Sequence, residues 1–237
     1  MWDKILDKNG HLLHGVEHVQ KRQKEFYEEL YTTQNIASTR EQDNFFLEHL
    51  NSKLTDEYKA FLDSDISIDE ISKSLYLMSN NKSPGPDGIC VEFYKMYWKD
   101  IKHDLFDCFM EGLQNQELSY TQYLAMITLL YKKGIREDIK NWRPISLLNV
   151  DFKIISKSLS ERLKKVMPSI IHTDQRGCIR GRYIGENIRL VEDILQSKDD
   201  DSVILLLDQE KAFDRVEWSW LYKVLTAFNF GENVYHG

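Results

Sequence analysis

The chain has 237 residues, of which 42% are hydrophobic, and this is enough for one large buried core or two modest ones. Its three cysteines form no C-x-x-C pair, which argues against a zinc ribbon and against a disulfide-stapled scaffold. Neither a signal peptide nor a membrane-spanning stretch is encoded, which argues against a membrane protein. These features predict an intracellular chain, cytoplasmic or nuclear, that is not secreted. The net charge of -7 is uneven, because residues 120–190 hold 14 Lys/Arg against 6 Asp/Glu, a local +8 that suits a polyanion, although a solvated helix face would give the same pattern.

The first eighty residues predict helices and linkers. Apolar residues between 19 and 30 share one helical face, and Ser67-x-x-Glu70 is a capping box that opens a further helix. The run SPGPDG at 83–88 then predicts a rigid turn, because its prolines fix φ and its glycines permit positive φ. Two helical patterns follow, with inward residues Ile89, Phe93, Met96 and Tyr97, and then Ile101, Leu105, Phe109 and Leu113.

A β-hairpin is predicted over residues 125–148. The pieces AMITLLY, at 125–131, and WRPISLL, at 142–148, are apolar and β-favourable, and the polar sequence between them forms a long basic tip. Pro144 places the second strand at a sheet edge or on a bulge, because proline cannot donate to a β-ladder.

Three later helices and one strand complete the pattern. The residues expected to point inward are Ile155, Leu159 and Leu163, then Ile184, Ile188, Val191 and Leu195, and finally Leu221, Val224, Leu225 and Phe228. The first of these helices should stop near Pro168. The strand, Val203 to Leu207, is apolar without a break, so we expect it to be buried on both faces. The predicted fold class is therefore α+β, mostly helical with a β-hairpin and a late strand.

An aspartate follows the predicted buried strand directly, at Asp208. Phosphoryl transfer to a hydroxyl needs divalent metal held by carboxylates on rigid elements, and a strand end gives a side chain little positional freedom. Asp208 and the carbonyl of Gln209 would then bind metal, with Phe213 as the floor beneath an incoming sugar. The alternative is a plain helix cap or turn residue.

Five stretches occur in the same order and at similar spacing in the reverse transcriptases of LINE-type, non-LTR retrotransposons. They are NKSPGPDGI, NWRPISLLN, DQRGCIRGR, GRYIGENI and LLLDQEKAFDRVEW, and they run from about Lys82 to about Phe228. The preceding HLLHGVEHVQKRQKEFYEELYTTQ resembles the segment that joins an upstream endonuclease to the polymerase. The resemblance implies a right-hand polymerase, with a helical extension over 1–80 and a partial reverse transcriptase domain over 81–237, divided into fingers at about 81–200 and the start of the palm at about 201–237.

The resemblance also implies roles for single residues. Asp208 matches the first metal-binding aspartate of the palm, which would hold Mg²⁺, and Phe213 matches the aromatic that excludes a 2'-hydroxyl. Arg143 matches the fingers arginine that contacts the incoming triphosphate, a role suited to a forked guanidinium. Lys132 and Lys133, at the hairpin tip, are placed to neutralise the same phosphates.

A further motif is expected near the template and the nucleotide. Gln175, Gly177 and Arg182 match the family's QxGF..GR element. Cys178 stands where the family has phenylalanine, which puts template packing at that point in doubt but leaves metal binding untouched. Asp214, by the same resemblance, is structural rather than a second metal ligand.

The intact protein would copy an RNA template onto a DNA primer from dNTPs, by two-metal transfer to the primer 3'-hydroxyl. The family's F/Y-A-D-D motif is absent from this sequence, and one carboxylate cannot hold two cations about 4 Å apart. We therefore expect that the chain, truncated before that motif, does not polymerise DNA alone. The alternatives are a non-catalytic module that binds RNA or RNA/DNA hybrid, an unstable product without function, and an intron-encoded reverse transcriptase.

Overall fold

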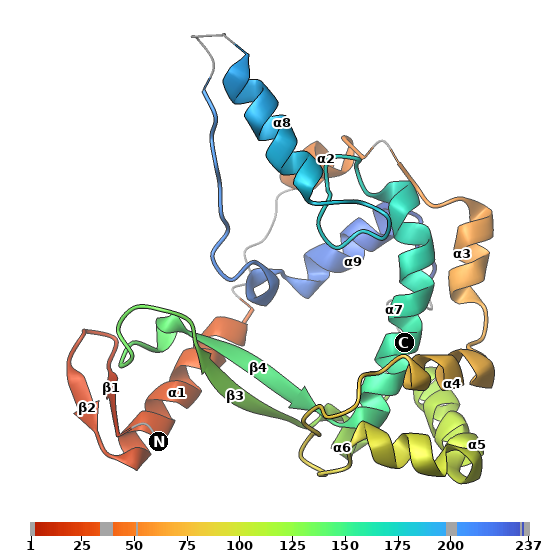
Figure 1. Ribbon diagram of the computed structural model, residues 1–237, viewed down its shortest axis with the longest axis horizontal. Coiled ribbons are helices and arrows are strands. Elements are labelled where there is room, and N and C mark those ends of the chain that lie inside the picture. Colours follow the sequence, from red (N-terminus) through yellow and green to blue (C-terminus); the bar gives the residue numbers. More distant parts are fainter. Residues whose placement is uncertain (1–2, 34–39, 51, 198–202, 233, 235–237) are drawn as a thin grey trace.

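The computed structural model describes residues 3–33, 40–50, 52–197, 203–232 and 234, which form helices and two small antiparallel sheets (Figure 1). The α+β class is thereby confirmed. The helices are α1 Val16–Tyr31, α2 Arg40–Leu47, α3 Asp56–Asp63, α4 Ile68–Tyr76, α5 Val91–Asn115, α6 Tyr120–Tyr123, α7 Val150–Ile170, α8 Gly185–Gln196 and α9 Trp218–Ala227. The strands are β1 Lys4–Leu6, β2 Leu12–His14, β3 Ala125–Tyr131 and β4 Trp142–Leu148, and 3₁₀ turns lie at Ile139–Asn141 and Ala212–Arg215. None of these helices combines the length and the apolar character that crossing a bilayer demands.

The N-terminal hairpin was not predicted from the sequence. Strands β1 and β2 pair antiparallel, with Ile5 opposite Leu13, but three residues are too few to show an alternating pattern. Ile5 is fully buried and packs with Val19 and Tyr27, and the predicted apolar face of α1 is confirmed there. The same cluster contains Ile139, so the N-terminal hairpin, α1 and the loop of the second hairpin share one small core.

The largest core lies where α4, α5 and α7 meet, at the lower right of Figure 1. Leu75 and Ile154 are fully buried in it, and the Trp98 indole donates to the Ser72 hydroxyl at 2.9 Å. The predicted capping box at the start of α4 is present in both directions, since the Glu70 amide bonds the Ser67 hydroxyl and the Ser67 amide bonds the Glu70 carboxylate. Sequence and structure agree on this helix start.

The inward face of α5 differs from the prediction. The two helical patterns merge into one helix, which buries Tyr94 and Trp98 while Phe93 is 43% and Met96 73% exposed. Both sets of residues have helical spacing, and the packing partners α4 and α7, distant in sequence, select between them. The prediction is thus wrong for Phe93 and Met96, whereas Phe109 is buried and Ile101, Leu105 and Leu113 pack against the same core, as predicted.

Helix α7 ends at Ile170, just past Pro168, in agreement with the predicted stop near that proline. Proline removes one amide donor, and the cost is small at the end of a helix whose last residues pack in a core. That core contains Val166 and Ile170 together with Leu54 and Phe230. Each of the three cores thus combines residues before and after position 80, so the helical extension over 1–80 packs on the rest of the chain.

The hairpin β3–β4 has the predicted bounds. It runs from Ala125 opposite Leu148 to Tyr131 opposite Trp142, without interruption. Pro144 faces Leu129 in a two-stranded sheet, so the edge position is confirmed and no bulge is needed.

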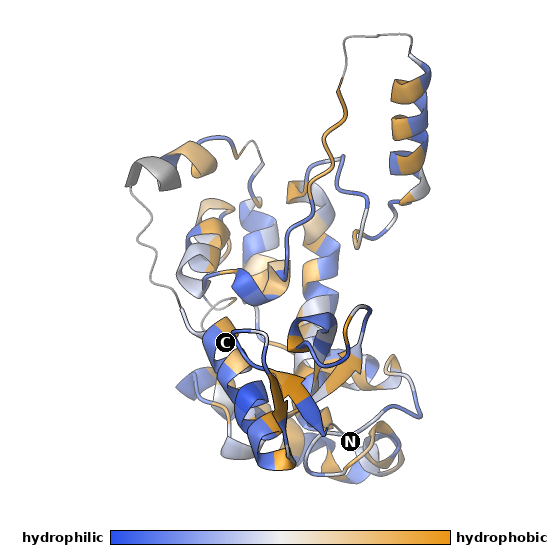
Figure 2. Ribbon diagram, turned by 90° about the vertical axis from the view of Figure 1, so that its left-hand side faces the viewer, coloured by the Kyte–Doolittle hydropathy of each residue, from blue (hydrophilic) through white to orange (hydrophobic). Residues whose placement is uncertain are grey.

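Helix α8 forms where it was predicted but buries none of its residues. It stands apart at the top of Figure 1, and Figure 2 shows the same helix set off from the other helices, with its apolar residues along one side. Ile188 is 61% and Leu195 70% exposed, so the expectation that they point into a core is wrong for this structure. An apolar stripe is buried only if another element covers it, and no element of the described chain does.

Candidate functional site

Residues 203–208 are extended but form no strand, which corrects the prediction of a palm strand buried on both faces. Val203 is 90% and Leu207 85% exposed. A strand persists only where its backbone groups pair with a neighbour, and the pairs in the described part of the chain are β1 with β2 and β3 with β4. Residue 202, also in the predicted strand, lies outside the described residues. Asp208 is consequently an exposed carboxylate on an unpaired segment.

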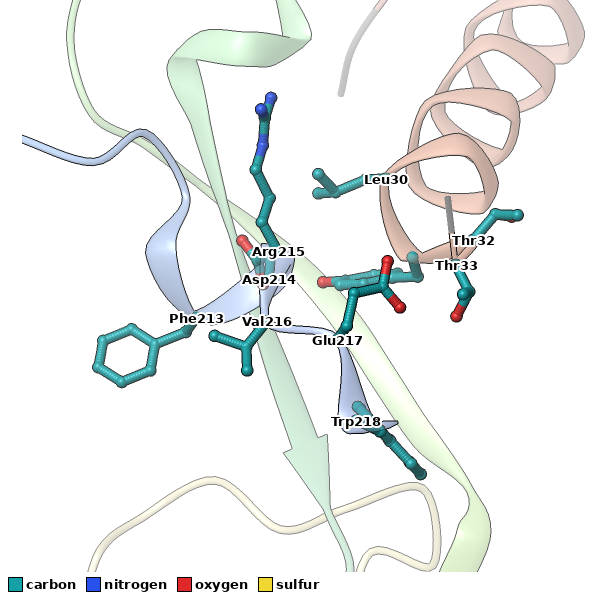
Figure 3. A pocket seen from close by; sticks show the side chains of 10 residues that line it. Leu30, Thr32, Thr33, Phe213, Asp214, Arg215, Val216, Glu217 and Trp218 are labelled. Atoms are coloured by element: carbon teal, nitrogen blue, oxygen red, sulfur yellow. The ribbon is translucent and has the colours of Figure 1, made fainter. Parts of the chain in front are cut away.

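The aromatic platform expected from Phe213 is not formed either. Phe213 lies in the second 3₁₀ turn and is 98% exposed. A cavity of about 630 Å³ lies between the end of α1 and residues 213–218. Figure 3 shows the Phe213 ring pointing away from Leu30 and Thr32 on the far side of that cavity. The ring contacts no surface on which a sugar would be held.

The residues expected to hold metal do not make a metal site by themselves. Across the described residues, no three His, Cys, Asp or Glu side chains gather where they could bind a cation. Asp208 supplies one carboxylate and Gln209, also exposed, supplies at most a carbonyl. A two-metal centre needs several carboxylates, so the donor set here does not fit one.

Asp214 lines the same cavity, near the end of α1. Its charge contributes, after burial, to the raised pKa of Tyr31, and together with burial and Tyr31 it raises the pKa of Tyr27 to about 12. Asp214 also interacts with the Lys211 ammonium, and its structural role stays a prediction.

The basic tip of hairpin β3–β4 is firmly shaped. The Lys132 amide donates to the Asn141 carbonyl at 2.9 Å, and the Trp142 indole donates to the Arg136 carbonyl at 2.8 Å. The Arg136 guanidinium lies 4.9 Å from the centre of the Tyr131 ring. These contacts hold a loop in which Lys132 and Lys133 are exposed.

Arg143 lies on β4 opposite Leu130 and is exposed as well. Among the described residues, no acidic side chain forms an ion pair with Arg143, Lys132 or Lys133. The structure therefore presents three uncompensated cations on one hairpin, an arrangement that attracts phosphates.

Gln175, Gly177 and Arg182 come together in the loop after α7. Arg182 uses its guanidinium inside the chain, donating to the carbonyls of Pro168, Ile171, His172 and Gln175. Two of these bonds, to Gln175 and Ile171, are 2.8 Å long. The Gln175 amide in turn donates to the Gly177 carbonyl at 3.3 Å. Arg182 thus satisfies the carbonyls at the end of α7 and shapes the loop, a role that the sequence did not indicate.

Two of the sequence motifs meet at Gly85 and Asn149. The Asp87 amide donates to the Asn149 side chain at 3.3 Å, and the Asn149 side chain donates to the Thr121 carbonyl at 2.8 Å. Gly85 packs so closely on Asn149 and Leu148 that a Cβ at this position would overlap both. Asn149 ends the stretch NWRPISLLN, and its place in that stretch was the only available sign of this role.

Residues 130–236 match the family model of reverse transcriptase (RNA-dependent DNA polymerase). The chain is also 37% identical over 233 residues to the transposon TX1 uncharacterized 149 kDa protein of Xenopus laevis, a match that covers 96% of this chain and 17% of that protein. The chain carries part of a LINE-type reverse transcriptase domain.

Two further relatives of this reverse transcriptase fragment are named as probable RNA-directed DNA polymerases. The probable RNA-directed DNA polymerase from transposon BS of Drosophila melanogaster is 28% identical over 203 residues, covering 74% of the chain and 22% of that protein. The corresponding protein of transposon X-element is 31% identical over 153 residues, covering 62% of the chain and 17% of that protein. The fragment thus spans about a fifth of the length of these relatives or less. Every predicted site residue, from Lys132 to Phe213, lies inside the range matched by the family model.

Proposed function

We propose that this chain is a nucleic-acid-binding part of an RNA-directed DNA polymerase and that it does not extend a primer alone. The observation that carries the proposal is that Asp208 is exposed and belongs to no group of three or more possible metal ligands among the described residues. In this proposal residues 81–200 are the fingers and residues 201–237 begin the palm. Asp208 is one ligand of a Mg²⁺ site that needs carboxylates from elsewhere to be complete.

The hairpin β3–β4 supports a role in nucleic-acid binding. Lys132, Lys133 and Arg143 are exposed and uncompensated on one rigid element, and the surrounding residues 120–190 carry the local charge of +8. In this proposal Arg143 contacts the triphosphate of an incoming dNTP and the two lysines contact the same phosphates. Without a nucleotide, the three cations are free to contact backbone phosphates of the hybrid. Gln175, Gly177 and Arg182 shape the template loop that follows α7. The partners are an RNA template and a DNA primer.

We expect the chain to bind an RNA/DNA hybrid with an affinity that falls steeply with salt, because each phosphate contact releases counterions. The variant Lys132→Gln, Lys133→Gln, Arg143→Gln should lower the slope of log K against log salt by roughly 2 to 3, since each lost contact removes about 0.9 from it. The measurement is fluorescence anisotropy of a labelled hybrid across a salt series.

A matched triple variant at Lys59, Lys99 and Lys102 serves as the control, because these lysines are on helices α3 and α5, away from the hairpin. It should keep the slope of the parent chain. Equal slopes of log K against log salt for the hairpin variant and the parent would contradict the role of the hairpin in nucleic-acid binding.

A further inference from the structure

A second cavity, of about 230 Å³, lies between α1, the first 3₁₀ turn and residues 210–215. It therefore joins three regions that are far apart in sequence: the N-terminal helix, the basic hairpin loop and the segment after Asp208. Its lining residues are Phe26, Glu29, Leu30, Lys140, Glu210, Lys211 and Arg215.

The charges around this cavity do not balance. Glu29 is paired with Lys8 at 3.1 Å, outside the lining, and Glu210 is paired with Arg215 at 3.6 Å. Among the described residues, no acidic side chain lies at ion-pair distance from Lys140 or Lys211. Asp214 interacts with Lys211 at longer range, as does Glu210. The cavity thus has an excess of positive charge on the side of these two lysines.

Lys211 is held in an unusual position. Its ammonium lies 4.4 Å from the centre of the Phe26 ring, is screened from solvent and has no hydrogen-bond partner. Burial lowers its pKa, as expected of an ammonium removed from water. Its backbone has φ of 51°, a left-handed conformation that is strained for a lysine. A buried cation without an acceptor costs free energy that a bound anion would recover.

Arg22 provides a second, independent observation. Its side chain is only 7% exposed, its guanidinium lies 5.7 Å from the centre of the same Phe26 ring, and its Nε and Nη1 atoms have no hydrogen-bond partner. Two buried cations with unused donors therefore lie against one aromatic ring at the edge of this cavity.

We propose that this cavity binds a phosphate group, with the ammonium groups of Lys211 and Lys140 as its ligands and Arg22 adding positive potential from beneath Phe26. The cavity volume exceeds that of a phosphate ion several-fold, so the group can belong to a larger molecule, either a nucleotide or a nucleic-acid strand. The site would couple the N-terminal helix to the segment that carries Asp208 when phosphate binds.

The test is calorimetric titration of the full chain with inorganic phosphate at neutral pH and constant ionic strength, beside Lys211→Met and the control Lys99→Met. Methionine keeps the apolar stem on Phe26 and removes the buried charge, so Lys211→Met should melt no lower than the parent without phosphate. We expect saturable binding to the parent and to Lys99→Met, weakened roughly tenfold or more in Lys211→Met, as losing a charged hydrogen bond predicts. Arg22→Met should weaken it as well.

Equal affinity in the parent and Lys211→Met, or no saturable binding by the parent, would overturn the proposal. Inorganic phosphate requires neither a hybrid nor the hairpin cations, so this outcome is separate from a failure of hybrid binding. Displacement of phosphate by dTTP would identify a nucleotide as the source of the group, and displacement by a single-stranded oligonucleotide would identify a strand.

Discussion

Arg162 is the residue on which the packing of α7 against the α3–α4 region depends most. It is 4% exposed and forms a two-bond pair with Glu70, at 2.8 and 2.7 Å, and it also donates to the carbonyls of Leu62, Ser64 and Asp65. Removing the buried Arg162 leaves the partly exposed Glu70 carboxylate without its partner and three carbonyls without their donor. We therefore expect Arg162→Met to lower the free energy of unfolding by about 3 to 5 kcal/mol, measured by urea denaturation.

The double variant Arg162→Met, Glu70→Met separates the ion pair from the backbone contacts. It removes both charges, so it should be more stable than Arg162→Met alone, yet less stable than the parent because three carbonyls still lack their donor. If the double variant were no more stable than Arg162→Met, the unpaired charge on Glu70 would not lower the free energy of unfolding.

The same ion pair makes the stability of the fold depend on pH. The hydrogen bond from Arg162, with others from Ser67, lowers the pKa of Glu70 from 4.5 to about 2 against the opposing effect of burial. A carboxyl whose pKa is lower in the folded state stabilises the fold above its unfolded pKa. This contribution should be complete above about pH 4.5 and lost as the pH falls towards 2.

Urea midpoints across this pH window should fall steeply for the parent and less steeply for Glu70→Gln. Glu161→Gln is the matched control, since the pKa of Glu161 is also lowered to about 2, but by Lys157 and Lys164 on a solvent-accessible helix face. Solvent screens that interaction, so Glu161→Gln should keep most of the pH dependence of the parent. A larger loss in Glu161→Gln than in Glu70→Gln would refute this assignment.

At the scale of elements, the turn at 83–88 is fixed by its contact with the start of α7. Gly85→Ala should lower the free energy of unfolding by about 1 to 3 kcal/mol, because the added methyl overlaps Asn149 and forces the turn away. Gly177→Ala is the control, since a Cβ there meets no atom within 4 Å and its φ lies outside the left-handed region. Chemical denaturation of both variants measures the difference, and similar losses would argue against close packing at Gly85.

Local patterns predicted elements well where the evidence for them was itself local. The bounds of β3–β4 and the capping box of α4 follow from neighbouring residues and agree with the structure. Which face is buried depends on distant partners, and for this reason Met96 and Ile188 were placed inward but are exposed. The prediction of a strand at 203–207 was wrong for the same reason, because a strand requires a neighbour to pair with.

For the candidate site, the sequence identified residue types better than their surroundings. The hairpin cations are exposed and unpaired as a phosphate-binding role requires, whereas Arg182 is engaged by four carbonyls of its own chain. Neither Arg162 nor Lys211 was singled out, because nothing in the local sequence shows that a cation is buried. Such roles arise from tertiary contacts alone.

At the scale of the whole molecule, the hairpin packs in the N-terminal core and α7 packs in the other two, while residues 203–208 remain unpaired and α8 uncovered. The three exposed hairpin cations thus lie on one paired element, whereas Asp208 lies on a segment that pairs with no other described residue. This difference is the physical basis for the claim that the chain binds nucleic acid without copying it.

The most direct measurement is primer extension on a poly(rA)/oligo(dT) hybrid with Mg²⁺ and dTTP, with the parent chain beside Asp208→Ala. We predict no extension by either protein, because one carboxylate cannot hold two cations. Extension by the parent that is lost in Asp208→Ala would contradict the account, since it would mean that the missing carboxylates come from another chain or from an unforeseen site.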